Sequence, residues 1–168
     1  QLKLSISPPT SSLSNTAAGI AVDASTIGSD STVVSSTVGW GFSLDGRKTL
    51  THLGAWTGGG SFGDIVIGIW NQTGNLLATA SVLQNNIDSY ESEGGFSYAA
   101  LSQSILLSSG ESYTVGAFYS GGLLASFGAP VTPINGLSFA TPSLVDFSGG
   151  SSLTLPTTSV SSTYANGF

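Results

Sequence analysis

The strongest constraint on the fold is an alternation of apolar with small or polar residues, repeated in short runs along the chain. Val38, Trp40, Phe42 and Leu44 form one such run, and a period of two is typical of a strand with one buried face. The same pattern predicts strands at 49–56, 76–83, 96–100, 112–119 and 160–164, with shorter ones at 138–139 and 152–155. Residues 64–70 are apolar on both sides, which predicts a central strand covered on both faces. No window shows the i, i+3, i+4, i+7 spacing of an amphipathic helix. Short strands separated by glycine-containing turns predict an all-β fold, a single antiparallel β-sandwich with a jelly-roll-like arrangement.

Two segments interrupt this regular pattern. The stretch QNNIDSYESEGG at 84–95 is the most polar in the chain, so we expect a surface loop there. Residues 121–142 contain a glycine pair and three prolines, and these residue types predict a looser region between strands.

The first residues form a separate strand-like arm. Leu2, Leu4 and Ile6 alternate with polar residues until two prolines end the run. The predicted organisation is therefore an arm at 1–9, a linker at 10–19 and the sandwich domain at 20–168. A lone strand is unstable and needs a sheet edge, so the arm either folds back onto its own sandwich or adds to a neighbouring subunit. The second arrangement, repeated head to tail, builds a filament in which Leu2, Leu4 and Ile6 form the subunit interface.

Composition limits the classes of function. The 168-residue chain has three basic and nine acidic residues, and charged residues make up 7% of it, against about 25% in an average soluble domain. Three basic side chains cannot form a face for nucleic acid, and 40% hydrophobic residues argue against disorder. No apolar run reaches the roughly 20 residues that span a bilayer.

Other features of the composition predict a secreted protein, extracellular or at the cell surface. The chain has no Cys, so disulfides and thiolate metal sites are excluded. It has 31 Ser and 17 Thr, few charges, and begins at Gln1 without a Met. Removal of a secretory signal is the ordinary route to such a start.

Few residues offer chemistry. His52 is the only histidine and lies inside a predicted strand without a nucleophile motif nearby in sequence, so a structural role is favoured and no cofactor is expected. Asp88, Glu91 and Glu93 form the one acidic cluster. Their oxygen atoms could ligate Ca²⁺, but a solvated loop explains the cluster more simply. A pair of carboxylates for glycoside hydrolysis has no specific signal among the nine acids.

Two positions suggest contacts with glycans. Trp40 and Trp70 lie in apolar strands and are expected in the core, whereas Trp56 stands beside a glycine run and is the better candidate for stacking against a sugar. Asn71 begins the sequence Asn-Gln-Thr in a predicted turn. This is the acceptor pattern for N-glycosylation, and it is equally a good turn sequence.

Five stretches together resemble a known kind of module: GWGFSL, KTLTHLGAW, VIGIWNQTGNLLATASV, FSYAAL and LLSSGESYTVGAFY. They are similar to secreted bacterial β-sandwich modules of unknown function, found in proteins with a PEP-CTERM sorting signal. The resemblance implies export and a role at the cell surface or in a biofilm matrix. It transfers no catalytic residue and does not extend to the arm.

Taken together, these features predict a non-enzymatic, exported structural subunit of an extracellular surface or matrix assembly. The most specific form of the prediction is a filament of identical copies joined by donor-strand addition of the arm. The alternative is a monomeric carbohydrate-binding or adhesive module with an exposed aromatic row and a Ca²⁺ near Asp88. A hydrolase is the third and weakest interpretation, because it would need two carboxylates in one cleft.

Overall fold

We analysed a computed structural model of the chain. The structure describes residues 22–23, 29–32, 35–57, 63–93, 96–120, 123–126, 132–133, 136–146 and 150–159, with backbone only for part of them. The predicted arm, the linker and the last expected strand at 160–164 lie outside these residues.

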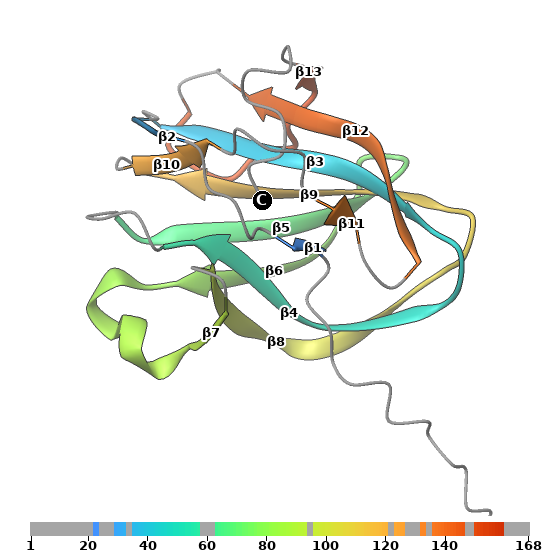
Figure 1. Ribbon diagram of the computed structural model, residues 1–168, viewed down its shortest axis with the longest axis horizontal. Coiled ribbons are helices and arrows are strands. Elements are labelled where there is room, and N and C mark those ends of the chain that lie inside the picture. Colours follow the sequence, from blue (N-terminus) through green and yellow to red (C-terminus); the bar gives the residue numbers. More distant parts are fainter. Residues whose placement is uncertain are drawn as a thin grey trace, which may run out of the picture.

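The described elements are strands and one 3-10 helix (Figure 1). They are β1 (Val22–Asp23), β2 (Ser29–Thr32), β3 (Ser36–Leu44), β4 (Lys48–Trp56), β5 (Ile65–Asn71), β6 (Leu76–Val82), η1 (Gln84–Ser89), β7 (Glu91–Glu93), β8 (Phe96–Leu107), β9 (Ser112–Tyr119), β10 (Leu123–Ser126), β11 (Thr132–Pro133), β12 (Leu137–Asp146) and β13 (Thr158–Ser159).

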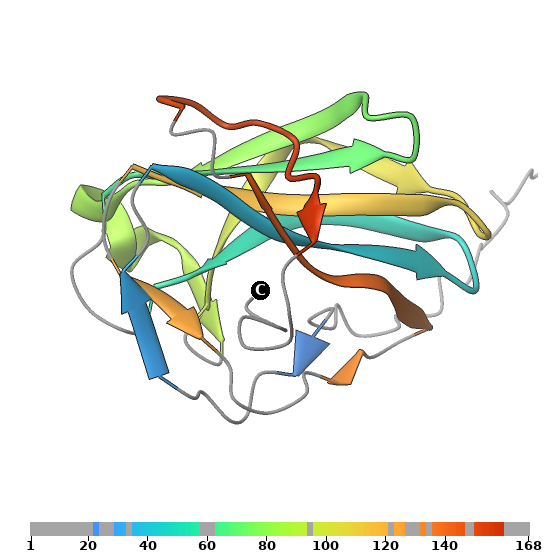
Figure 2. The same cartoon turned by 90° about the horizontal axis from the view of Figure 1, so that it is seen from above.

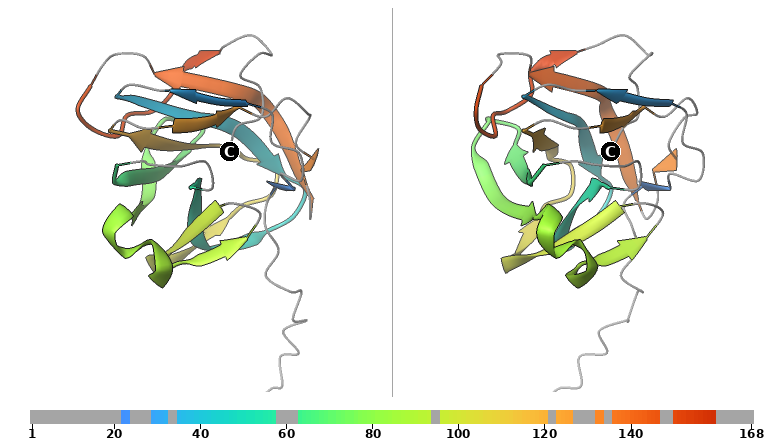
Figure 3. Two further views of the ribbon diagram at one scale, coloured as in Figure 1. Left: turned by 60° about the vertical axis from the view of Figure 1, so that its left-hand side comes forward. Right: turned by 90° about the vertical axis from the view of Figure 1, so that its left-hand side faces the viewer.

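The described strands form four antiparallel sheets, of which two are the strand pairs β1–β11 and β10–β2. The two largest sheets pack against each other (Figure 3). The larger sheet has the strand order β13-β12-β3-β9-β5-β6, and the smaller has the order β4-β8-β7. The chain passes from β3 in the larger sheet to β4 in the smaller and back to β5, and it later passes from β8 to β9 in the same way. The predicted all-β sandwich is confirmed.

The strand pairings define a turn end of the sandwich, where residues 45–47, 72–75 and 108–111 lie. Two backbone hydrogen bonds fasten these connections together. Gly110 N donates to Leu44 O at 3.0 Å, and Asp45 N donates to Gly136 O at 2.9 Å. The helix η1 and strand β7 lie at the opposite end.

The core fills the space between the two sheets. Alternate residues of β3, β5 and β9 point inward, and the fully buried Ile65, Ile67 and Tyr119 are among the largest. Leu53 and Ala55 of β4 meet them from the smaller sheet. Burying one such large side chain stabilises the fold by about 1.5–3 kcal/mol. The period-two alternation seen in the sequence therefore marks the inward face of each strand.

The described part of the region expected to be loose contains strands. It contains the start of β12, which runs over ten residues where only 138–139 was expected as strand. Pro142 lies in this strand, where the pairing with β3 shifts register between Thr141 and Leu144. A proline lacks the N–H that a regular ladder needs, and the irregularity accommodates it.

Two other local expectations were wrong. The polar stretch 84–95, expected as a loop, contains η1 and β7. Residues 152–155, expected as a strand, form an extended segment without a ladder partner. This segment lies over the outer face of the larger sheet, where side chains rather than a ladder hold it.

Candidate functional site

The outer face of the larger sheet is covered by an extended segment, residues 150–157, which we call the strap (Figure 2). Pro156 is fully buried. Thr154 N donates to Thr37 Oγ1 of β3 at 3.1 Å, and the two threonine hydroxyls lie 3.3 Å apart. Buried Thr37 therefore replaces the ladder partner that the strap lacks.

Glycines make room for the strap. Gly39, Gly116 and Gly68 are paired across β3, β9 and β5 and form a row on the outer face. A Cβ atom at Gly116 would lie 3.2 Å from Pro156 Cγ, and one at Gly68 would lie 2.8 Å from Leu153 Cδ2. Larger residues at these positions would lift the strap from the sheet.

Two large aromatic residues share this outer face. Trp70 and Phe118 alternate with the inward-facing residues of β5 and β9, yet both are buried. The Trp70 ring lies next to the position that a Gly68 Cβ would occupy, together with Leu153. The larger sheet thus buries apolar side chains on both faces, as expected from the apolar run at 64–70.

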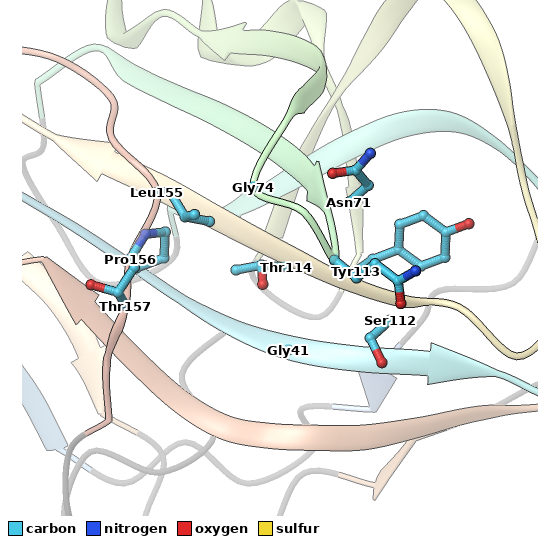
Figure 4. A pocket seen from close by; sticks show the side chains of 10 residues that line it. Gly41, Asn71, Gly74, Ser112, Tyr113, Thr114, Leu155, Pro156 and Thr157 are labelled. Atoms are coloured by element: carbon cyan, nitrogen blue, oxygen red, sulfur yellow. The ribbon is translucent and has the colours of Figure 1, made fainter.

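A groove of about 310 Å³ lies beside the strap. Figure 4 shows Leu155 and Pro156 on one side, Asn71 and Ser112 on the other, and Gly41 on the strand beneath. All the groups that line it are uncharged. Hydroxyl and amide groups can hydrogen-bond to a neutral polar ligand.

The predicted turn at the groove's edge is present between β5 and β6. Asn71 Oδ1 accepts hydrogen bonds from Thr73 N at 3.1 Å, Thr73 Oγ1 at 2.8 Å and Asn75 N at 2.9 Å. Gly74 adopts the left-handed conformation at φ +80°, which glycine tolerates best. The turn interpretation of Asn71 is confirmed, and its glycosylation stays a prediction.

Tyr113 forms a wall of the groove. Its hydroxyl makes two hydrogen bonds, one as acceptor and one as donor. Tyr113 Oη accepts from Ser108 N at 2.8 Å and donates to Glu111 Oε2 at 2.9 Å. Burial raises the pKa of Tyr113, the Ser108 N–H lowers it in part, and Glu111 raises it further. The phenol is thus held by hydrogen bonds to the β8–β9 connection on both sides of its oxygen.

The free edge of β6 is a second surface of interest. β6 is the last strand of the larger sheet, and among the described residues no strand pairs with its other side. It lies close to β8 of the smaller sheet without pairing with it. Among the described residues, the exposed large hydrophobic ones belong to β6 and β8 or follow directly after β6: Leu76 (51% exposed) and Leu77 (39%) in β6, Leu83 (38%) directly after it, and Leu106 (60%) in β8.

The other edges of the two sheets have features that discourage pairing with another chain. Strands β13 and β7 have only two and three residues. The edge strand β4 begins with exposed Lys48 and has a register irregularity between Leu50 and His52. Short strands, lysines and irregularities are the usual protections of a sheet edge.

Strand β6 lacks most of these protections. Its sequence LLATASV contains no charge and no proline. Its pairing with β5 is regular from Val82 to Ala78 and shifts only next to the hairpin turn. Among the edges that the structure describes, β6 is thus the one best suited to accept a further strand.

A domain of unknown function, DUF4082, matches residues 23–164. The chain belongs to the DUF4082 family. No curated protein and no solved structure matches it.

The DUF4082 match begins at Asp23 and extends over β3 to β9, β12 and the strap. It leaves out the arm residues Leu2, Leu4 and Ile6. These three residues also lie outside the described part of the chain, so their contacts stay a prediction.

The aromatic candidate in this DUF4082 domain is corrected by the structure. Trp56 is 4% exposed, as are Trp40 and Trp70. Its ring packs edge-to-face against Phe96, with centroids 5.6 Å apart, because Phe96 is its direct cross-strand partner in β8. Trp56 therefore presents no open ring face for a sugar, whereas the burial of Trp40 and Trp70 is confirmed.

The polar candidates are dispersed over several elements. His52 is half-buried in β4, and its Nδ1 lies 2.9 Å from the Thr51 hydroxyl. Asp88 lies in η1, and Glu91 and Glu93 lie in β7. The structure describes their backbone but not their side chains, so the Ca²⁺ site stays a prediction. No group of three or more His, Asp or Glu that could hold a metal occurs among the side chains that are described.

Two features of the domain were not recognised in the sequence, namely the strap and the unprotected edge. The edge had a usable signal, because LLATASV follows a turn and lacks charge and proline. The sequence of the strap resembles that of a strand, because polar and apolar residues also alternate in a segment that lies on the face of a sheet. The described part of the chain also contains no helix with the length and hydropathy of a membrane span.

Proposed function

We propose that this DUF4082 protein is a non-enzymatic, exported structural subunit of an extracellular surface or matrix assembly. Copies join into a filament by β-strand addition of the N-terminal arm, through Leu2, Leu4 and Ile6. The observation that carries the proposal is the unprotected edge of β6, which a soluble monomer would ordinarily protect.

The physical basis is that a lone strand and an open sheet edge both have unpaired backbone groups, which pair when the strand adds to the edge. The alternating residues Leu2, Leu4 and Ile6 match one face of a strand, and an added strand gains both ladder hydrogen bonds and apolar burial. A net charge of −6 on 168 residues is also small enough to allow close approach of identical copies.

Export is supported by composition and by resemblance. A chain with 7% charged residues, no Cys and no Met has few of the side chains that proteases and oxidants attack. Its blocks are similar to secreted modules, and the same resemblance supports a surface or matrix role.

The test compares the full chain with a variant lacking residues 1–9 and with the triple variant Leu2→Ser, Leu4→Ser, Ile6→Ser. Size-exclusion chromatography with light scattering and negative-stain microscopy measure assembly. We expect polymers from the full chain and monomers from both variants. Lys3→Gln, which changes the other face of the arm, is the matched control and should polymerise. Polymers that form equally well without the arm would contradict the proposal.

The groove beside the strap supports a second candidate, a monomeric carbohydrate-binding module. Its uncharged lining suits the hydroxyl groups of a neutral sugar better than a charged ligand. A glycan array tests it: binding by the monomeric full chain that is lost in Ser112→Leu would support this candidate. An array without hits would count against it. Thr49→Leu, at an exposed position of β4, is the control.

A further inference from the structure

We propose that the acceptor of the arm is the free edge of β6 in a second copy of the chain. This inference rests on the proposed function, because it names the partner surface for the same strand addition. It could fail while strand addition itself is correct, if the arm adds to another edge.

The first argument is elimination among the edges that the structure describes. An incoming strand of about five residues needs a regular row of free backbone groups of similar length. Strands β1, β7, β11 and β13 have only two or three residues, and β2 and β10 have four. Strand β4 is interrupted at Leu50–His52. The side of β8 beyond Tyr98 has no partner among the described strands, but there its register with β4 jumps from Ala100 to Ile105. The five residues of β6 from Ala78 to Val82 offer a regular row without charge or proline.

The second argument is the apolar surface at this edge. Leu76 and Leu77 begin β6, and Leu106 lies near the end of β8. Since β6 starts and β8 finishes at the turn end of the sandwich, these three exposed leucines lie at the same end of two neighbouring strands. An arm with apolar residues at alternate positions would bury part of this surface, which a single polar strand would not.

The third argument concerns which copy supplies the arm. The described chain begins at β1, which pairs with β11, and β11 lies next to β12. In the larger sheet, β12 and β6 lie on opposite sides, separated by β3, β9 and β5 (Figure 2). The four strand spacings between them amount to about 19 Å.

A donor that leaves near one edge and an acceptor at the opposite edge form a head-to-tail contact. Such a contact joins two different surfaces, so, repeated without closing into a ring, it propagates into a filament. The placement of β1 and β6 therefore fits the assembly that the arm requires.

Cysteine cross-linking tests the contact, because the chain has no Cys of its own. Full-length chains with Ser5→Cys are mixed with chains carrying Thr79→Cys, an exposed position of β6, under mild oxidation. The matched control replaces the second chain by Thr51→Cys, an exposed position of the protected edge β4. We expect at least a tenfold higher yield of mixed dimer with Thr79→Cys, measured by mass spectrometry. Equal yields, or a higher yield with Thr51→Cys, would overturn the assignment to β6.

A doubly substituted chain, Ser5→Cys with Thr79→Cys, separates the two sources of the arm. Dilution below the concentration at which copies associate leaves only contacts within one chain. Loss of the cross-link on dilution supports a second copy as the donor. A monomeric product whose yield does not depend on concentration shows that the arm docks on its own molecule and overturns this part of the proposal.

A charge on the edge gives an independent readout. Thr79→Lys should abolish polymers while leaving the melting temperature within a few degrees, whereas Thr51→Lys on β4 should change neither. If removal of residues 1–9 abolishes assembly and Thr79→Lys does not, the assignment of the acceptor to β6 is wrong. Assembly by strand addition of the arm would still be supported. If removal of residues 1–9 has no effect, the proposed function fails first.

Discussion

In the larger sheet, side chains on the two faces are more buried than those at the free edge of β6. Ile67 on the inner face is completely buried in the core, and Trp70 on the outer face is buried beside Leu153 of the strap. At the edge, Leu77 remains 39% exposed within the same sheet, only a few residues along the chain. The faces are therefore sealed within the molecule, while the edge keeps apolar side chains and backbone groups available.

This difference indicates that stability and assembly are located in separate parts of the sheet. Substitutions on the covered faces should change the free energy of unfolding, and substitutions at the β6 edge should change association alone. Four measurements can sharpen or break this separation, and they follow in order of expected effect on stability.

The largest effect is expected at Gly39, in the glycine row beneath the strap. In Gly39→Ala the new Cβ would lie 2.7 Å from Gly116 Cα and 2.9 Å from the Val115 carbonyl carbon, so backbone has to move. We expect a loss of about 3 kcal/mol, at the upper end of the usual range for overpacking, measured by urea unfolding. Gly46→Ala has nothing within 4 Å of its Cβ and should stay within about 0.5 kcal/mol of the parent protein. Similar stabilities for the two variants would contradict this account of the row.

The second effect is expected at the attachment point of the strap. Thr37→Val keeps the side-chain shape but removes the oxygen that accepts from Thr154 N. Loss of a buried hydrogen-bond acceptor should cost about 1–2 kcal/mol and should increase quenching of tryptophan fluorescence by acrylamide. Thr49→Val, at an exposed position of β4, serves as the comparison. Unchanged quenching would show that the strap does not depend on this contact.

The third effect appears only at alkaline pH. Tyr119 is completely buried in the core, and burial raises its pKa above the ordinary value of 10.0, although a hydrogen bond with the Trp56 backbone acts in the opposite direction. Above pH 10 the unfolded chain loses this proton while the folded chain keeps it, so stability falls as pH rises, by up to about 1.4 kcal/mol per pH unit. Tyr119→Phe should reduce that slope in urea unfolding between pH 10 and 11. An identical slope in both proteins would show that Tyr119 ionises without unfolding.

The smallest effect on stability is expected at the open edge. Leu77→Ser should change the free energy of unfolding by less than about 0.5 kcal/mol, as is usual for an exposed position. If copies associate through this edge, the same substitution should reduce assembly measured by light scattering. A loss of several kcal/mol would instead place Leu77 in the core and break the comparison.

Much of the fold follows from sequence alone, and the reasons for the failures are physical. Strands such as β3 and β9 were predicted almost to the residue, because one buried face imposes alternation and turns mark their ends. Strand β12 was largely missed, since Pro142 contradicts a regular ladder and only the tertiary structure supplies the irregularity that tolerates it.

The site was less predictable than the fold. Trp56 appeared exposed because glycines follow it, but cross-strand pairing with Phe96 is a long-range property that local sequence does not reveal. The strap could not be identified either, because its alternation satisfies a sheet surface and a sheet ladder equally well. The sequence did contain the uncharged run of β6, although its position as the last strand of a sheet required the structure.

The strap also has a mechanical consequence. Its residues precede β13 and follow β12 along the chain, and Thr154 and Pro156 are anchored to β3 and β9. A tensile load applied beyond residue 159 would have to detach β13 and then pull the strap away before it could peel β12 from its neighbour. The contacts of the strap with the glycine row would then open after β13 and before β12, and so protect the larger sheet from the load.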